Sequence, residues 1–289
     1  MSTSIYKTTA QVTFFSTVEK TLSFIYRIAL SRMIGAEGLG IYQIALSVFS
    51  VLLTAASSGV PVTVSRLITK QNALGNTAGR SAVVTAGIVS TLIFTVPAVA
   101  LIFGGQKIFG LLFSDERCLE VFLIILPGLI LTSVYSVMRG AFWGDRQFMP
   151  YSLIELAEDA LMVGLGCILV AGAAGAADGA RRAAVAVFVS YVFSFAVSLF
   201  WYFKKGGRLV NPSKQLKPLL SSSLPVTAMR TATSLLNSLV AVLMPFLLVK
   251  MCRYTDSEAV SLYGAAAGMA VPNSGIRRNR NQKTERWST

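Results

Sequence analysis

The chain has 289 residues, of which 54% are hydrophobic and only 13% are charged, whereas an ordinary soluble domain carries roughly 25% charged residues. A water-exposed surface cannot be built from so few charges, and the apolar residues fall in blocks of about 20, the length of a helix that spans a bilayer. The net charge of +13 does not indicate nucleic acid as a partner, because the basic residues lie in the short segments between apolar blocks, where cytoplasmic loops face anionic lipid.

The residue types that most enzymes need are scarce. The chain has no histidine, and its three cysteines, Cys118, Cys167 and Cys252, have no paired short spacing. Without histidine the commonest general base is absent, and no Ser, Cys or carboxylate constellation replaces it. The sequence therefore predicts no enzyme activity, no disulfide framework, no metal site and no cofactor.

Seven apolar blocks predict the crossings. The first covers residues 12–33 and a glycine-rich turn at 35–40 ends it, because glycine disfavours helix. A second block at 39–56 breaks at the Ser-Ser-Gly-Val-Pro segment 57–61 and resumes to residue 68. The remaining blocks cover residues 81–103, 119–138, 151–174, 183–203 and 219–249. We expect an all-α, multi-pass membrane bundle of about seven transmembrane helices.

The distribution of Lys and Arg sets the expected orientation. More of them fall in the segments on the side of the N-terminus, above all in the segment Lys204–Lys217, than in the segments on the opposite side. Positive loops stay in the cytoplasm. We therefore expect a cytoplasmic N-terminus, and the long, charged first block predicts no cleavable signal peptide.

The C-terminal end differs from the rest of the chain. An eighth apolar run starts at Ala259 but stops near Pro272, which is too short to cross a bilayer, and residues 275–289 read GIRRNRNQKTERWST. We expect residues 1–274 to form the helical bundle and residues 275–289 to form a disordered basic tail. Such a tail is either natural or the product of a truncation or frameshift.

Three basic residues inside apolar blocks are candidate substrate-binding residues. A charge at the bilayer centre costs about 2.5 to 3.5 kcal/mol, so such residues usually face protein or a wet cavity. Lys20 and Arg27 are seven residues apart and share a helix face, and Arg230 lies in the seventh block. A basic stripe of this kind suits a phosphate or pyrophosphate, for which Arg offers a bidentate fork. The alternative is that Glu19 and Lys20 lie at the inner interface and meet lipid headgroups.

Three acids at the start of the fifth block form a second candidate site. Glu155, Glu158 and Asp159 share one helix face by their i, i+3, i+4 spacing. They could neutralise the basic stripe or bind a coupling cation. Alternatively, they form an interfacial acidic face at a helix start, where negative charge suits the macrodipole.

A short repeat is also visible. Residues 61–66 and 225–230 share the pattern P-V-T-x-x-R. The two copies fall on the second and seventh crossings, which would not correspond in a six-helix repeat. We interpret the match as coincidence or a shared local bend.

Four segments carry a family resemblance: FIYRIALSRMIGAEGLGIYQ (24–43), SGVPVTVSR (58–66), MRGAFWGDRQFMP (138–150) and LYGAAAGMAVP (262–272). Together they resemble the stage V sporulation protein B group of polysaccharide biosynthesis proteins, in the multidrug, oligosaccharidyl-lipid and polysaccharide flippase superfamily. The resemblance implies that the chain corresponds to the N-terminal half of a two-bundle fold around a central cavity. It also implies that Arg27 matches a cavity arginine of related lipid II flippases.

The resemblance predicts a flippase or exporter of lipid-linked polysaccharide or peptidoglycan precursors in a bacterial cell membrane, linked to spore cortex or cell-wall formation. Its partners would be a lipid-linked oligosaccharide or lipid II-like substrate and membrane lipids. One alternative is a cation-coupled multidrug exporter of the same superfamily that uses Glu155, Glu158 or Asp159. Another is a non-functional membrane fragment.

Overall fold

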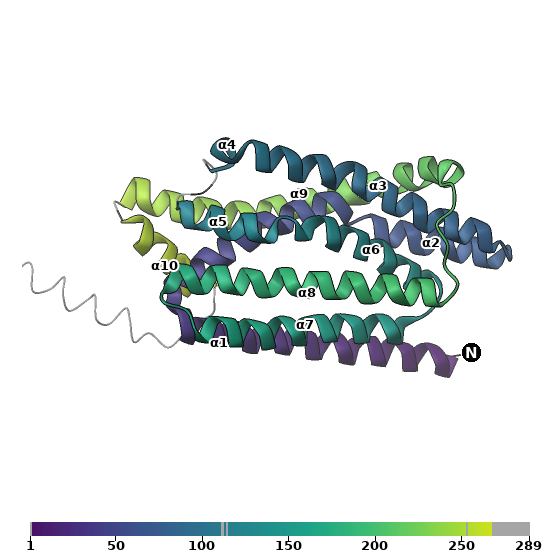
Figure 1. The fold of residues 1–289 in the computed structure, drawn as a ribbon, viewed down its shortest axis with the longest axis horizontal. Coiled ribbons are helices and arrows are strands. Elements are labelled where there is room, and N and C mark those ends of the chain that lie inside the picture. Colours follow the sequence, from purple (N-terminus) through teal and green to yellow (C-terminus); the bar gives the residue numbers. More distant parts are fainter. Residues whose placement is uncertain (1, 111–112, 114, 253, 268–289) are drawn as a thin grey trace, which may run out of the picture.

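The computed structural model describes residues 2–110, 113, 115–252 and 254–267, and every regular element in these ranges is a helix. The long helices run side by side along the long axis of the molecule (Figure 1). The elements are α1 (Ser2–Ser57), α2 (Val60–Ala73), α3 (Thr77–Gly104), α4 (Gln106–Gly110), α5 (Glu116–Ile125), α6 (Gly128–Gly144), α7 (Phe148–Ala171), α8 (Ala176–Lys204), α9 (Ser213–Cys252) and α10 (Asp256–Ala267).

Helix α1 consists of two arms that fold back on each other at Gly35. Gly35 has φ 72° and ψ −178°, a left-handed φ that glycine adopts without the steric cost of a Cβ. Glu19 in the first arm and Leu53 in the second line the same cavity, whereas 34 residues of straight helix would separate them by about 50 Å. The predicted turn at 35–40 is therefore confirmed, with the non-helical geometry confined to Gly35.

Two further predicted blocks contain a break or bend. Helix α1 ends at Ser57 and α2 begins at Val60, as the Ser-Ser-Gly-Val-Pro segment predicted, with Pro61 in the first turn of α2, where proline is tolerated. The predicted single block 119–138 is a bent pair, because α5 and α6 meet at 44° on either side of Leu126 and Pro127. The helices thus follow the predicted blocks, but two of the blocks are interrupted or bent in the structure.

Helix length and composition support a membrane-spanning bundle. In the described residues, three helical stretches are long and apolar enough to cross a membrane, or up to four if the bent pair α5 and α6 is one span. The first stretch, Ala10–Ala73, contains both arms of α1 and all of α2, so it is longer than one crossing. The number of about seven crossings stays a prediction.

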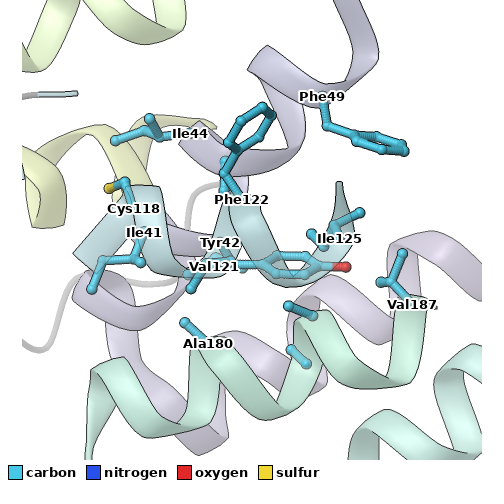
Figure 2. Packing of buried hydrophobic residues seen from close by; sticks show 14 of the residues in the cluster. Ile41, Tyr42, Ile44, Phe49, Cys118, Val121, Phe122, Ile125, Ala180 and Val187 are labelled. Carbon is cyan, nitrogen blue, oxygen red and sulfur yellow. The ribbon is translucent and has the colours of Figure 1, made fainter. Parts of the chain in front are cut away.

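The buried side chains form two clusters along the bundle. The first joins both arms of α1 to α5 and α8, with Tyr42, Phe122 and Val187 among its members; Figure 2 shows part of it. The second joins α2, α3 and α6 to the starts of α7 and α9. Because the same helices run through both clusters, the bundle is one packed unit.

Helix α10 packs on the second arm of α1 through glycines. A Cβ on Gly40 would overlap the carbonyl oxygen of Val260, and one on Gly264 would overlap that of Ala36. Only glycine permits such close backbone approach, as in membrane helix pairs with small residues at the contact. The described part of α10 ends at Ala267; the predicted end near Pro272 and the tail 275–289 lie outside the described residues.

Charged side chains tie the helix ends together. Asp145, at the end of α6, accepts hydrogen bonds from Asn72 Nδ2 at 3.0 Å and Arg80 Nε at 3.0 Å. Glu37, beside the kink of α1, accepts from Arg117 Nη1 at 2.8 Å and Ser257 Oγ at 2.7 Å. These contacts fix α3 against α6 and α10 against α1.

Candidate functional site

An acidic cavity of about 260 Å³ lies inside the bundle, between α1, α6, α7 and α8. Its position is where the two buried clusters meet, because Tyr191 packs on the first cluster and Tyr135 belongs to the second. The lining residues are Glu19, Leu53, Ser57, Thr132, Tyr135, Ser136, Arg139, Glu155, Glu158, Asp159 and Tyr191.

The three acids of α7 line this cavity together, as their shared helix face predicted. Their side chains are half-buried in the bundle. Glu19 of α1 joins them in lining the cavity. Four carboxylates therefore surround a hollow in an apolar bundle, where unpaired charge is costly.

One cation faces these acids. Arg139 Nη1 lies 3.5 Å from Glu155 Oε1, and the two side chains are 32% and 25% exposed. Its guanidinium carbon also lies 5.6 Å from the centre of the Trp143 ring. One guanidinium cannot balance four carboxylates, so the cavity keeps an excess of negative charge unless it takes up protons or cations.

Unpartnered polar atoms add to the character of the hollow. The Tyr135 hydroxyl and Arg139 Nε are buried and have no hydrogen-bond partner in the structure. Buried polar groups normally have partners. In the described residues, no three His, Cys, Asp or Glu side chains stand close enough to hold a metal ion.

The sequence prediction missed Arg139 as a member of this site. The predicted fourth block ends at residue 138, whereas Arg139 lies within α6. A signal for it exists, because Thr132, Tyr135, Ser136 and Arg139 recur at i, i+3, i+4 and i+7, the pattern of one helix face. Arg139, and not Lys20 or Arg27, supplies the ion pair that the α7 acids make.

Lys20 and Arg27 lie on one face of the first arm of α1, as their spacing predicted. Both are exposed in the bundle, whereas Tyr26 is only 3% exposed. Arg27 is near enough to Tyr42 and Tyr263 for its charge to act on both hydroxyls. Lys20 and Arg27 therefore form a cationic face on the surface of the first arm.

Arg230 lies on α9 at the break between α1 and α2. Its Nη1 donates to the carbonyl oxygen of Ser58 at 3.3 Å, and the Thr227 hydroxyl accepts from the backbone N–H of Gly59 at 3.1 Å. Both side chains belong to the second P-V-T-x-x-R segment and contact the residues just before the first. The repeat thus marks two segments that meet in the fold.

The long apolar helices, the charged groups enclosed among them and the broken crossings define a multi-pass helical membrane protein. Residues 5–276 match the model of the polysaccharide biosynthesis protein family. The chain belongs to this family, which confirms the resemblance carried by its four segments.

Two curated relatives come from Bacillus subtilis (strain 168). Stage V sporulation protein B is 26% identical over 230 residues, which cover 74% of this chain and 43% of the relative. Lipid II flippase MurJ is 24% identical over 174 residues, covering 56% of this chain and 32% of the relative. The chain therefore spans less than half the length of these relatives.

Solved transporters share the fold. A MOP superfamily transporter from Pyrococcus furiosus gives a TM-score of 0.68 at 19% identity, covering 91% of this chain and 62% of the other. An outward-facing multidrug resistance transporter of the MATE family gives a TM-score of 0.67 at 19% identity, covering 91% of this chain and 62% of the other. An inward-facing one gives a TM-score of 0.65 at 18% identity, covering 86% of this chain and 57% of the other. These comparisons show that the chain has the fold of part of these transporters.

Proposed function

We propose that this protein acts as a flippase or exporter of lipid-linked polysaccharide or peptidoglycan precursors in a bacterial cell membrane, in spore cortex or cell-wall formation, with its N-terminus in the cytoplasm. Family membership supports the transporter class, and the relatives named for sporulation and for lipid II support the substrate class. The Lys204–Lys217 segment supports the orientation.

The observation that carries the proposal is the exposed Arg27. It lies in a membrane-length helix with its side chain exposed at the bundle surface, and within the described part of the chain it forms no ion pair. An unneutralised guanidinium there offers its fork to a pyrophosphate. Lys20 extends the same face by two helical turns, and Arg230 supplies a cation from α9.

Arg27 is tested by substitution in an intact relative, at the position that matches this sequence. We expect Arg27→Ala to reduce outward movement of a labelled lipid-linked precursor by at least tenfold, with Arg27→Lys in between because Lys lacks the fork. Arg32→Ala is the matched control, since Arg32 is exposed on the same helix near its other end. Normal export by the Arg27→Ala protein would remove the proposed role.

A second candidate function, cation-coupled export of drugs, has one specific observation in its favour. Glu155, Glu158 and Asp159 line a partly open cavity with an excess of negative charge. Protons or a sodium ion could enter such a site and leave it during transport. Dye efflux that requires a sodium or proton gradient and is lost in Glu158→Gln, but kept in the exposed control Glu120→Gln, would favour this candidate over the first.

A further inference from the structure

The break between α1 and α2 leaves backbone groups that need partners. Pro61 has no N–H, so the carbonyl of Ser57 loses its donor four residues on. The N–H of Gly59 turns to Thr227 instead of continuing the helical pattern of α1. Within a membrane no water replaces such partners, so broken helices depend on neighbouring helices.

Helix α9 provides hydrogen-bond partners for backbone groups at the break. Thr227 accepts from Gly59, and Arg230 donates to Ser58, the residue that follows the end of α1. A cation suits this place because the C-terminal end of a helix carries partial negative charge, and Arg side chains cap such carbonyls. Gly59 is required, because a Cβ would overlap the Ser223 carbonyl and the Thr227 hydroxyl of α9.

The hydrogen bond of Arg230 can be exchanged for a stronger one. At 3.3 Å to a neutral carbonyl it is long, and the side chain is exposed. Phosphate oxygens bind guanidinium in short, charge-assisted, bidentate pairs. An anion on the exposed cationic face therefore competes with the Ser58 carbonyl for the same guanidinium.

The break also touches the acidic cavity. Ser57, the last residue of α1, lines the cavity together with Leu53, and the next residue carries the carbonyl that Arg230 caps. A change in the cap thus alters a residue that faces the acids. The exposed cation and the enclosed carboxylates are joined through three consecutive residues.

We propose that Arg230 and Thr227 are positioning residues that hold the α1–α2 break in the unloaded protein, and that a phosphate group bound at Arg230 removes the cap and loosens the break. The part that concerns phosphate rests on the proposed function. Anion binding at Arg230 then affects the acidic cavity through the loosened break.

The test is hydrogen exchange of the backbone amides of residues 57–60, 62 and 63 in the full chain, reconstituted in lipid nanodiscs. Arg230→Ala and Thr227→Val speed this exchange by roughly tenfold, the effect of losing a hydrogen bond to the backbone. Thr227→Ser keeps the hydroxyl and is the matched control. Arg66→Ala is the second control, since Arg66 ends the first P-V-T-x-x-R segment and is exposed.

Adding millimolar inorganic pyrophosphate tests whether an anion displaces Arg230 from the break, because a cap with only a structural role would leave the exchange rates unchanged. It speeds exchange of the same amides in the wild-type chain and in Arg66→Ala, and has no further effect in Arg230→Ala. If the amides of Thr227→Val and Arg230→Ala exchange at the wild-type rate, the two residues do not hold the break. If pyrophosphate does not change the exchange rate of the wild-type chain, phosphate does not compete with the Ser58 carbonyl for Arg230. If Arg230→Ala does not fold, the proposal is tested by comparing Thr227→Val with Thr227→Ser and by the response of the wild-type chain to pyrophosphate. Loss of the Arg27 export effect would refute the proposed function and leave the exchange of Arg230→Ala unchanged.

Discussion

Removal of the one cation in the acidic cavity should destabilise the bundle in a pH-dependent way. At 3.5 Å and an effective dielectric of about 20, the attraction between Arg139 and Glu155 is roughly 5 kcal/mol. Desolvation and partial exposure offset more than half of it. We therefore expect Arg139→Ala to lower the free energy of unfolding by about 2 kcal/mol at neutral pH.

The pH dependence follows from the groups that face Arg139. Those in direct interaction with it are Glu155 and the hydroxyls of Tyr151 on α7 and Tyr135 on α6. The acids Glu19, Glu158 and Asp159 line the same cavity. Above the carboxylate pKa values the variant leaves four negative charges unpaired, whereas below them the acids are neutral and Arg139 contributes little. The penalty should therefore be full at high pH and fade as the pH falls.

The measurement is thermal unfolding followed by the reaction of a thiol-specific dye with Cys118, which is 1% exposed in the fold. Arg181→Ala is the control, because its ion pair with Glu120 is 44% and 51% exposed. Adding Glu155→Gln to Arg139→Ala should recover part of the loss. Equal stability of Arg139→Ala and wild type at every pH would refute the electrostatic account of the cavity.

Two other changes test the packing, by the same unfolding assay. Asp145→Ala leaves a guanidinium that is only 19% exposed without its partner and should cost about 3 kcal/mol, whereas Glu120→Ala should cost under about 1 kcal/mol; equal effects would contradict the importance of the buried pair. Gly40→Ala should cost about 2 kcal/mol, because its methyl group would overlap the Val260 carbonyl; Gly164→Ala, with nothing within 4 Å, should be neutral or stabilising.

The positions of the helices could be predicted because the bilayer constrains the sequence strongly. Each predicted block overlaps a helix or helix pair, and the segments rich in glycine, serine and proline at 35–40 and 57–61 mark the kink and the break. The bend between α5 and α6 lies at Pro127, a residue type that can kink a membrane helix. A single Pro127 in an apolar run is also compatible with a straight membrane helix, so its consequence depends on the packing around it.

The site could be predicted only in part. Hydropathy and the positions of charged residues indicate the side of the membrane on which a residue lies, but they do not indicate which side chains it contacts. The shared face of Glu155, Glu158 and Asp159 followed from helical spacing. Arg139 was misplaced because a basic residue after an apolar block reads as a loop residue. The partner of Glu155 depends on how α6 packs beside α7, and no local pattern contains that information.

The first arm of α1 carries opposite charges on two neighbouring faces, which follows from the geometry of the helix. Successive residues are about 100° apart and residues seven apart nearly coincide. Glu19 therefore shares a face with Tyr26, which is buried, while Lys20 shares the next face with Arg27, which is exposed. The same helix thus carries one wall of the acidic cavity and the proposed phosphate-binding face. If a proton or cation entering the cavity reduces repulsion between Glu19 and the α7 acids, the first arm of α1 can move closer to α7, and Arg27 must move with it. Coupling between the two charge systems then requires no contact between them, only a rigid helix, so a glycine placed between Lys20 and Arg27 should weaken coupling while leaving both sites intact.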